Sequence, residues 1–236
     1  MKKPVVDYRK LRLSNIRTPE YSHLFLLLGW VGYFLLYFLT ENFIPAERCH
    51  PMHCRLDDLI PFNEFFLIFY VSWYVLIVVS LGYFLLYDVK SFKSLQTYII
   101  ITQAVAMAIY ILFPSRQDLR PAVFTRDNFL TRLMAFIYTV DTSTGVCPSL
   151  HVAYSLGIAS TWLKKRDASP AVKAFVTVLV FFICISVAFV KQHSVLDIVA
   201  AIPLGILAEF LVFRNYWRQR LTAAKTQGSS EKIDKS

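Results

Sequence analysis

The feature that most constrains the fold of this chain is a series of long apolar stretches that contain no charged residue. A segment of roughly 20 such residues can cross the hydrocarbon core of a bilayer, and it does so as a helix because every backbone amide needs a partner within the segment. With 56% hydrophobic residues, the chain is also more apolar than an ordinary soluble domain. The sequence therefore predicts an all-α, polytopic membrane protein.

Six stretches are candidates for crossing the membrane. Three are uncharged and long, the fourth is uncharged but contains Pro148 and His151, the fifth is a dense apolar run, and the sixth is short and holds Glu209. In order, they are residues 21–40, 65–87, 95–115, 142–163, 174–190 and 198–213. We expect a bundle of about six transmembrane helices.

The basic residues lie in alternate connections between these stretches. Of 25 Lys and Arg residues, 18 fall in the N-terminal segment, near residues 90–93 and 164–173, or after residue 213. The positive-inside rule then predicts that both termini are cytoplasmic and that 41–64, 114–149 and 191–197 face outward, most simply at the plasma membrane. The net charge of +9 is explained by this topology and by attraction to anionic membrane lipids, and no nucleic-acid-binding motif is present.

The chain is expected to hold one membrane domain. A basic cytoplasmic segment, 1–20, precedes the six-helix domain, 21–217, and a polar cytoplasmic tail, 218–236, is expected to be disordered because it has few apolar residues to bury. The first apolar run is full length and follows a polar, basic segment, which favours an uncleaved anchor over a signal peptide.

Two outward segments carry further patterns. Apolar residues from Phe129 to Val140 recur at helical spacing, which predicts an amphipathic helix that either lies on the membrane and gates the site or packs as a cap. The loop Cys49-His50-Pro51-Met52-His53-Cys54 holds four metal-ligating side chains. A disulfide between Cys49 and Cys54, two separate thiols and a zinc site all remain open there.

Polar and ionisable residues at the ends of apolar helices are usually functional, because charge is costly there. They gather in residues 116–121, 148–151 and 191–197, all predicted to face outward. His193 and Asp197 are four residues apart on one helix face, so the carboxylate can accept the second N–H of the imidazole, fixing its tautomer and raising its basicity.

This set of residues fits phosphoryl transfer. An oriented His193 is a competent nucleophile toward phosphorus, and His151, two crossings earlier, can protonate the leaving oxygen. Cations and N–H donors are also needed around the phosphoryl oxygens. The candidates for phosphate binding are Arg120, Ser149, Lys191 and Arg116. The chemistry requires neither a metal nor a cofactor.

Three motifs stand in order along the chain: Arg120-Pro121, Pro148-Ser149-Leu150-His151, and His193 with Asp197 four residues later. In order and spacing they resemble the motifs of the type 2 phosphatidic acid phosphatase superfamily, which includes lipid phosphate phosphatases and the vanadium haloperoxidases. The resemblance covers roughly residues 95–214. It implies a phosphohistidine intermediate on the nucleophile His193, with Asp197 orienting it, His151 as the acid, and Arg120 and Ser149 binding phosphate.

The chain also departs from the pattern of that superfamily. Phe113 and Val187 stand where a lysine and an arginine are usual, and Arg116 and Lys191 are candidate substitutes. Leu150 replaces the common glycine and is similar to the branch with inositol phosphorylceramide synthase, while the His-His-Asp set is also similar to that of sphingomyelin synthases. The leading prediction is a lipid phosphate phosphatase. A headgroup phosphotransferase is the alternative, and a non-catalytic transporter or scaffold is the third.

Overall fold

The computed structural model describes residues 3–233, with side chains described as far as Gln219. The regular secondary structure of the described part is almost entirely helical, which confirms the all-α prediction. Its α-helices are α1 Leu28–Phe43, α2 Arg55–Leu59, α3 Leu67–Tyr87, α4 Val89–Leu112, α5 Phe129–Val140, α6 Leu150–Lys164, α7 Pro170–Phe189 and α8 Val195–Ile233. Four 3-10 turns accompany them: η1 Tyr8–Lys10, η2 Ser22–Leu27, η3 Ala46–Arg48 and η4 Glu64–Phe66. Two short strands, β1 His50–Pro51 and β2 Ser115–Arg116, pair in parallel and tie two distant loops together.

Within residues 3–233, five helical segments are long and apolar enough to cross a membrane, rather than the six expected from sequence. They are Ser22–Phe43, Glu64–Tyr87, Val89–Leu112, Pro170–Phe189 and Val195–Gln219.

The difference lies in the predicted stretch 142–163. Its first residues form a loop through Pro148, and the helix starts only after Ser149. The Ser149 hydroxyl caps the helix, because its oxygen accepts a hydrogen bond from the amide of Val152. The resulting α6 has 15 residues and a length of about 22 Å, against roughly 30 Å of hydrocarbon. It packs against α3, α4, α7 and α8, so other helices surround it.

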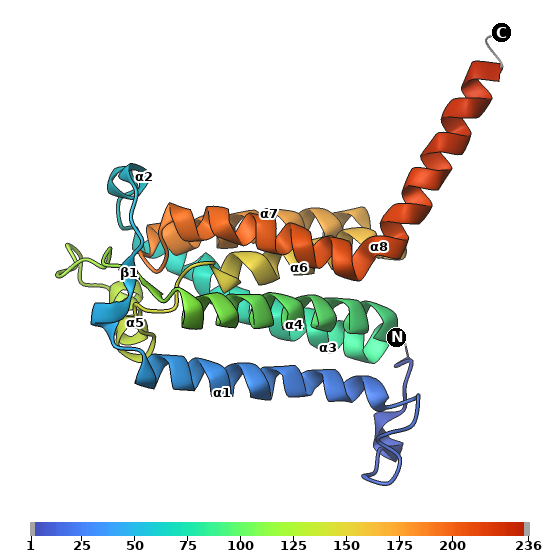
Figure 1. Cartoon of the computed structure of the whole chain (residues 1–236), viewed down its shortest axis with the longest axis horizontal. Helices are drawn as coiled ribbons and strands as arrows, with labels where there is room; N and C mark the ends of the chain where they lie inside the picture. Colours follow the sequence, from blue (N-terminus) through green and yellow to red (C-terminus); the bar gives the residue numbers. More distant parts are fainter. Residues whose placement is uncertain (1–2, 234–236) are drawn as a thin grey trace.

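The last helix is longer than expected. It begins at Val195, changes direction at Phe213, where the backbone leaves helical geometry, and then points away from the bundle (Figure 1). The tail predicted to be disordered continues this helix to Ile233, and residues 234–236 lie outside the described part. The Ala, Lys, Arg and Gln residues from 218 to 227 favour helix, whereas Gly228, Ser229 and Ser230 favour it less, so helix propensity accounts only for the first part of the tail.

Small residues let the central helices approach closely. A side chain added at Gly157 of α6 would lie 2.4 Å from the ring of Tyr98, and one added at Gly205 of α8 would lie 2.9 Å from its hydroxyl. The Tyr98 hydroxyl donates to the carbonyl of Gly205 at 3.2 Å. Helices α4, α6 and α8 therefore meet around one fully buried tyrosine, as small residues allow in membrane bundles.

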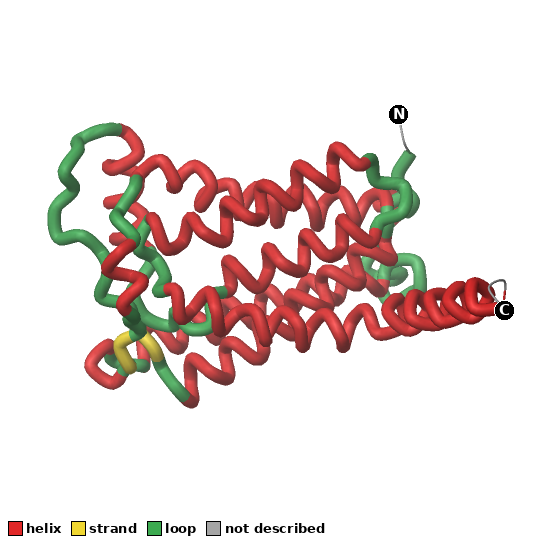
Figure 2. The backbone as a smooth tube through the Cα atoms, turned by 90° about the horizontal axis from the view of Figure 1, so that it is seen from above, coloured by secondary structure: helices red, strands yellow, loops and turns green. Residues whose placement is uncertain are grey.

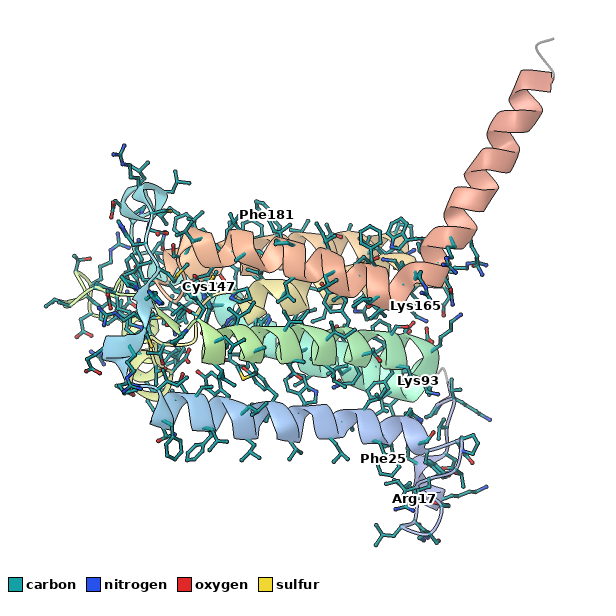
Figure 3. The ribbon with its side chains drawn as sticks, viewed as in Figure 1. Arg17, Phe25, Lys93, Cys147, Lys165 and Phe181 are labelled. Carbon is teal, nitrogen blue, oxygen red and sulfur yellow. The ribbon has the colours of Figure 1, made fainter. Side chains whose placement is uncertain are left out.

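The two ends of the bundle differ. Helix α1 begins, and α8 leaves the bundle, at one end, and the longest loops and both strands gather at the opposite end (Figures 1 and 2). Figure 3 places Lys93 and Lys165 at the first end and Cys147 at the second. Helix α6 starts deeper in the bundle than the loop-side end of α7 (Figure 1). The predicted amphipathic helix is present as α5, which buries Met134 and exposes Phe129 and Phe136.

Candidate active site

A histidine in the turn before α8 and an aspartate in the first turn of α8, four residues later, form the centre of the site. His193 Nδ1 lies 3.3 Å from Asp197 Oδ2, and that same oxygen accepts the amide of Ser194 at 2.9 Å. Asp197 is fully buried at the first turn of α8, and His193 is only 7% exposed. A carboxylate in this position favours the tautomer with a proton on Nδ1, which leaves the lone pair of Nε2 as a hydrogen-bond acceptor.

A second imidazole faces that nitrogen. His193 Nε2 lies 3.4 Å from His151 Nδ1, and the two rings meet edge to face. Two aromatic rings of α3 hold His151: Tyr70 stacks on it with centroids 4.7 Å apart, and Trp73 lies 4.1 Å away. His151 Nε2 is buried and has no hydrogen-bond partner among the described residues.

Local backbone geometry brings the two histidines together. The turn after α7 places Lys191 in the left-handed region, with φ +53°, and the amides of Gln192 and His193 both donate to the carbonyl of Val187. This conformation is unfavourable for a residue with a side chain, so the turn is held by its surroundings. The amide of Ser149 donates to the carbonyl of Asp197 at 3.0 Å, which joins the start of α6 to the start of α8.

Arg120 connects the loop before α5 with the loop after it. Its guanidinium donates to the carbonyls of Tyr138, Asp141 and Thr142 and to the side-chain oxygen of Gln192 at 2.7 Å. It also lies over the ring of Tyr138, 4.6 Å from the centroid. The predicted phosphate ligand therefore reaches the residue next to His193, but present partners occupy much of its donor capacity.

Gln192 and Asp141 are polar residues of the site that the sequence analysis did not assign. The Gln192 amide donates to Asp141 Oδ2 at 3.0 Å, and Asp141 also accepts the hydroxyls of Tyr37 at 3.2 Å and Tyr70 at 3.4 Å. Their sequence signals were weak: Gln192 precedes His193 directly, and Asp141 ends the amphipathic segment.

Asp57 is a third such residue, and no pattern in the sequence marked it. Its carboxylate accepts the Ser194 hydroxyl at 2.6 Å and the amides of Val195 and Cys54 at 2.8 Å each. Burial alone would raise the pKa of Asp57, but these hydrogen bonds outweigh burial and hold it below its usual value. The loop around α2 is thereby fastened to the start of α8.

Two of the predicted phosphate ligands are turned elsewhere. The ammonium of Lys191 donates to the carbonyls of Asp57 and Ile60, and burial lowers its pKa. The guanidinium of Arg116 binds Asp118 and the carbonyl of Ala46. Like Arg120 and Ser149, neither side chain lines the cavity described below, so neither replaces the missing basic residues in this conformation.

The loop from Cys49 to Cys54 forms neither the disulfide nor the zinc site that its sequence left open. Cys49 and Cys54 are free thiols, so the disulfide considered for them is not formed. Cys49 donates to the carbonyl of Pro45, and Cys54 caps α2. His50 stacks on Phe113, and His53 pairs with Asp58. Within residues 3–233, no three His, Cys, Asp or Glu side chains are grouped to hold a metal ion.

A cavity of about 610 Å³ opens beside the two histidines. His151, His193, Gln192 and Asp141 line its polar end, and the rest of its wall is mostly aromatic and aliphatic. Pockets of this kind, apolar with a few convergent polar groups, are typical binding sites for small ligands. The arrangement places the imidazole of His193 at the wall of a largely apolar cavity.

Comparisons with protein-family models, with curated proteins and with solved structures find no match to this chain.

Proposed function

We propose that this protein is a lipid phosphate phosphatase that cleaves a phosphomonoester or diphosphate of a membrane lipid through a phosphohistidine on His193. The observation that carries the proposal is the geometry of one imidazole: Asp197 holds Nδ1, while Nε2 faces His151 at the polar end of an apolar cavity. An apolar cavity that ends in ionisable groups suits a substrate with a lipid tail and a charged head.

In this proposal, His193 Nε2 attacks phosphorus and the bond to the lipid oxygen breaks. His151 donates the proton that the leaving oxygen needs, and it then takes a proton from the water that hydrolyses the phosphohistidine. Asp197 stabilises the positive charge that develops on the ring of His193. The guanidinium of Arg120 contributes positive charge near the phosphoryl oxygens.

Substrate binding requires movement at this site. The two imidazole nitrogens are 3.4 Å apart, which leaves no room for phosphorus and its oxygens between them. The ring of His151 must therefore turn aside, and the guanidinium of Arg120, which does not line the cavity, must move toward the phosphate. Catalytic hydrogen bonds commonly rearrange in this way between the free and the substrate-bound states.

The proposal is tested by phosphate release from purified protein in detergent micelles. The substrates are phosphatidic acid, phosphatidylglycerol phosphate, undecaprenyl diphosphate and sphingoid phosphates. His193→Ala is expected to abolish turnover, and Asp197→Asn to lower kcat less, because the nucleophile remains but loses its orienting partner. His53→Ala is the matched control, since His53 is exposed and pairs with Asp58 in a loop. Turnover by His193→Ala at the wild-type rate would overturn the mechanism.

Headgroup transfer is the second candidate, and Leu150 in the second motif is the feature that favours it. The same phosphohistidine chemistry would then pass a phosphorylated headgroup to a lipid alcohol. Labelled headgroup appearing in a new lipid, with no phosphate release from any substrate, would support transfer over hydrolysis. If vanadate, which resembles the five-coordinate phosphorus, inhibits neither reaction, the non-catalytic alternative gains support.

A further inference from the structure

The cavity beside the histidines continues far along the bundle, between α1 and α3. From α3 it is lined by residues 73, 74, 77, 78, 81, 82 and 85, which form one helix face. At 1.5 Å per residue, the distance from Trp73 to Leu85 is about 18 Å. On the opposite wall, α1 contributes Tyr37 near the polar end, and η2 contributes Leu27 near the far end. The passage is therefore long and follows the helices.

The far end of the passage is apolar and lies near the opposite side of the bundle from the histidines. It reaches Leu27, Leu85 and Phe92. Phe92 is fully buried in the first turn of α4, and the ring of His23 lies 5.8 Å from it, edge to face. A half-bilayer is roughly 15 Å of hydrocarbon thick, so this passage is as long as one lipid chain.

A glycine widens the passage close to its far end. Gly82 of α3 lines the cavity, and a side chain added there would meet nothing within 4 Å. Gly32 of α1 also has open space around it, but it is exposed and does not line the cavity. The two positions therefore differ in one respect that matters: a large side chain at Gly82 would fill the passage, and one at Gly32 would project outward.

We propose that the passage between α1 and α3 binds a single alkyl chain of the lipid phosphate, and that the open space at Gly82 sets the longest chain accepted. The identity of the headgroup rests on the function proposed above. Bilayer lipid is as apolar as this wall, so burial adds little preference for any length. The passage selects alkyl chain length by steric exclusion, because a chain too long for the passage holds its phosphate away from His193.

The test compares monoacylglycerol phosphates from octanoyl to stearoyl. For each variant, the ratio of kcat/KM for stearoyl to that for octanoyl is measured. Gly82→Phe is expected to lower this ratio roughly tenfold or more, the scale on which a pocket discriminates chain length. Gly32→Phe is expected to leave it at the wild-type value. An unchanged ratio in Gly82→Phe, or an equal fall in both variants, would overturn the proposal.

A second measurement does not depend on turnover. A stearoyl chain with a terminal diazirine, on a monoacylglycerol phosphate, is irradiated with the His193→Ala protein and the labelled residues are mapped. Labelling near Leu27, Leu85 and Phe92 that excess unlabelled lipid prevents is expected, even if no substrate releases phosphate and the proposed function fails. Labelling confined to the exposed face of α7 around Phe181, which points out of the bundle (Figure 3), would contradict the inference.

Discussion

The carboxylate of Asp57 and the hydroxyl of Ser194 are joined by a hydrogen bond of 2.6 Å, although 137 positions separate the two residues in the chain. Ser194 follows His193 directly, and its amide donates to Asp197. One loop carboxylate therefore holds the backbone from which both members of the histidine and aspartate pair project. We regard Asp57 as a positioning residue, since it contacts neither imidazole ring.

Replacement of Asp57 by asparagine is expected to lower kcat and stability together. Two amides and a hydroxyl now donate to the carboxylate, and the NH₂ of asparagine would face a donor. A buried donor left without an acceptor costs about 1–3 kcal/mol. The measurements are thermal unfolding in detergent and kcat. Asp58→Asn is the control, because Asp58 is exposed, and equal effects of both variants would contradict the role of Asp57.

The stabilisation by Asp57 is expected to depend on pH in the acid range. Its folded pKa lies below the usual 3.8, so its contribution is fully present above that pH and is lost as pH falls through the lowered value. The Tm difference between wild type and Asp57→Asn should therefore be constant near neutral pH and narrow below pH 3.8. A Tm difference that widens on acidification would contradict a folded pKa of Asp57 below its usual value.

Gln192→Glu is expected to weaken substrate binding more than Gln192→Ala. The new carboxylate would face the guanidinium of Arg120 and lie beside the carboxylate of Asp141, where it competes with phosphate and repels it. A hydrogen bond to a charged group contributes about 1.5–3 kcal/mol, so kcat/KM should fall at least roughly tenfold. The KM and kcat of both variants are measured. A larger loss in Gln192→Ala would argue against phosphate binding near Arg120.

Phosphate release is expected to be insensitive to EDTA, because the proposed reaction uses histidine, aspartate and arginine side chains. The assay compares rates before and after dialysis against chelator, with added Zn²⁺ or Mg²⁺ as the restoring step. Loss of activity that Zn²⁺ restores would instead direct attention to the Cys49 to Cys54 loop.

The sequence was informative where the relationship between residues is local or follows from helix direction. The spacing of four residues predicted the contact between His193 and Asp197, although His193 lies in the turn before α8 rather than on the helix face expected. Two intervening helices return the chain to the end of the bundle where His151 lies. Asp57 had no such signal, because its contact with Ser194 depends on how a distant loop folds back. Lys191 was predicted to face phosphate, but nearby loop carbonyls attract its ammonium. An uncharged run also cannot show where a helix starts, which is why α6 is shorter than expected.

The shortness of α6 has a consequence for how a lipid would be used. Its first turn carries His151 and begins deeper in the bundle than the loop-side end of α7 (Figure 1). In the proposed function, a lipid headgroup would have to enter the bundle and shed hydrating water before reaching the imidazoles, because His193 is buried. Dehydration of a phosphate is costly, and the cost rises with its charge. Such a recess favours the less ionised form of the headgroup.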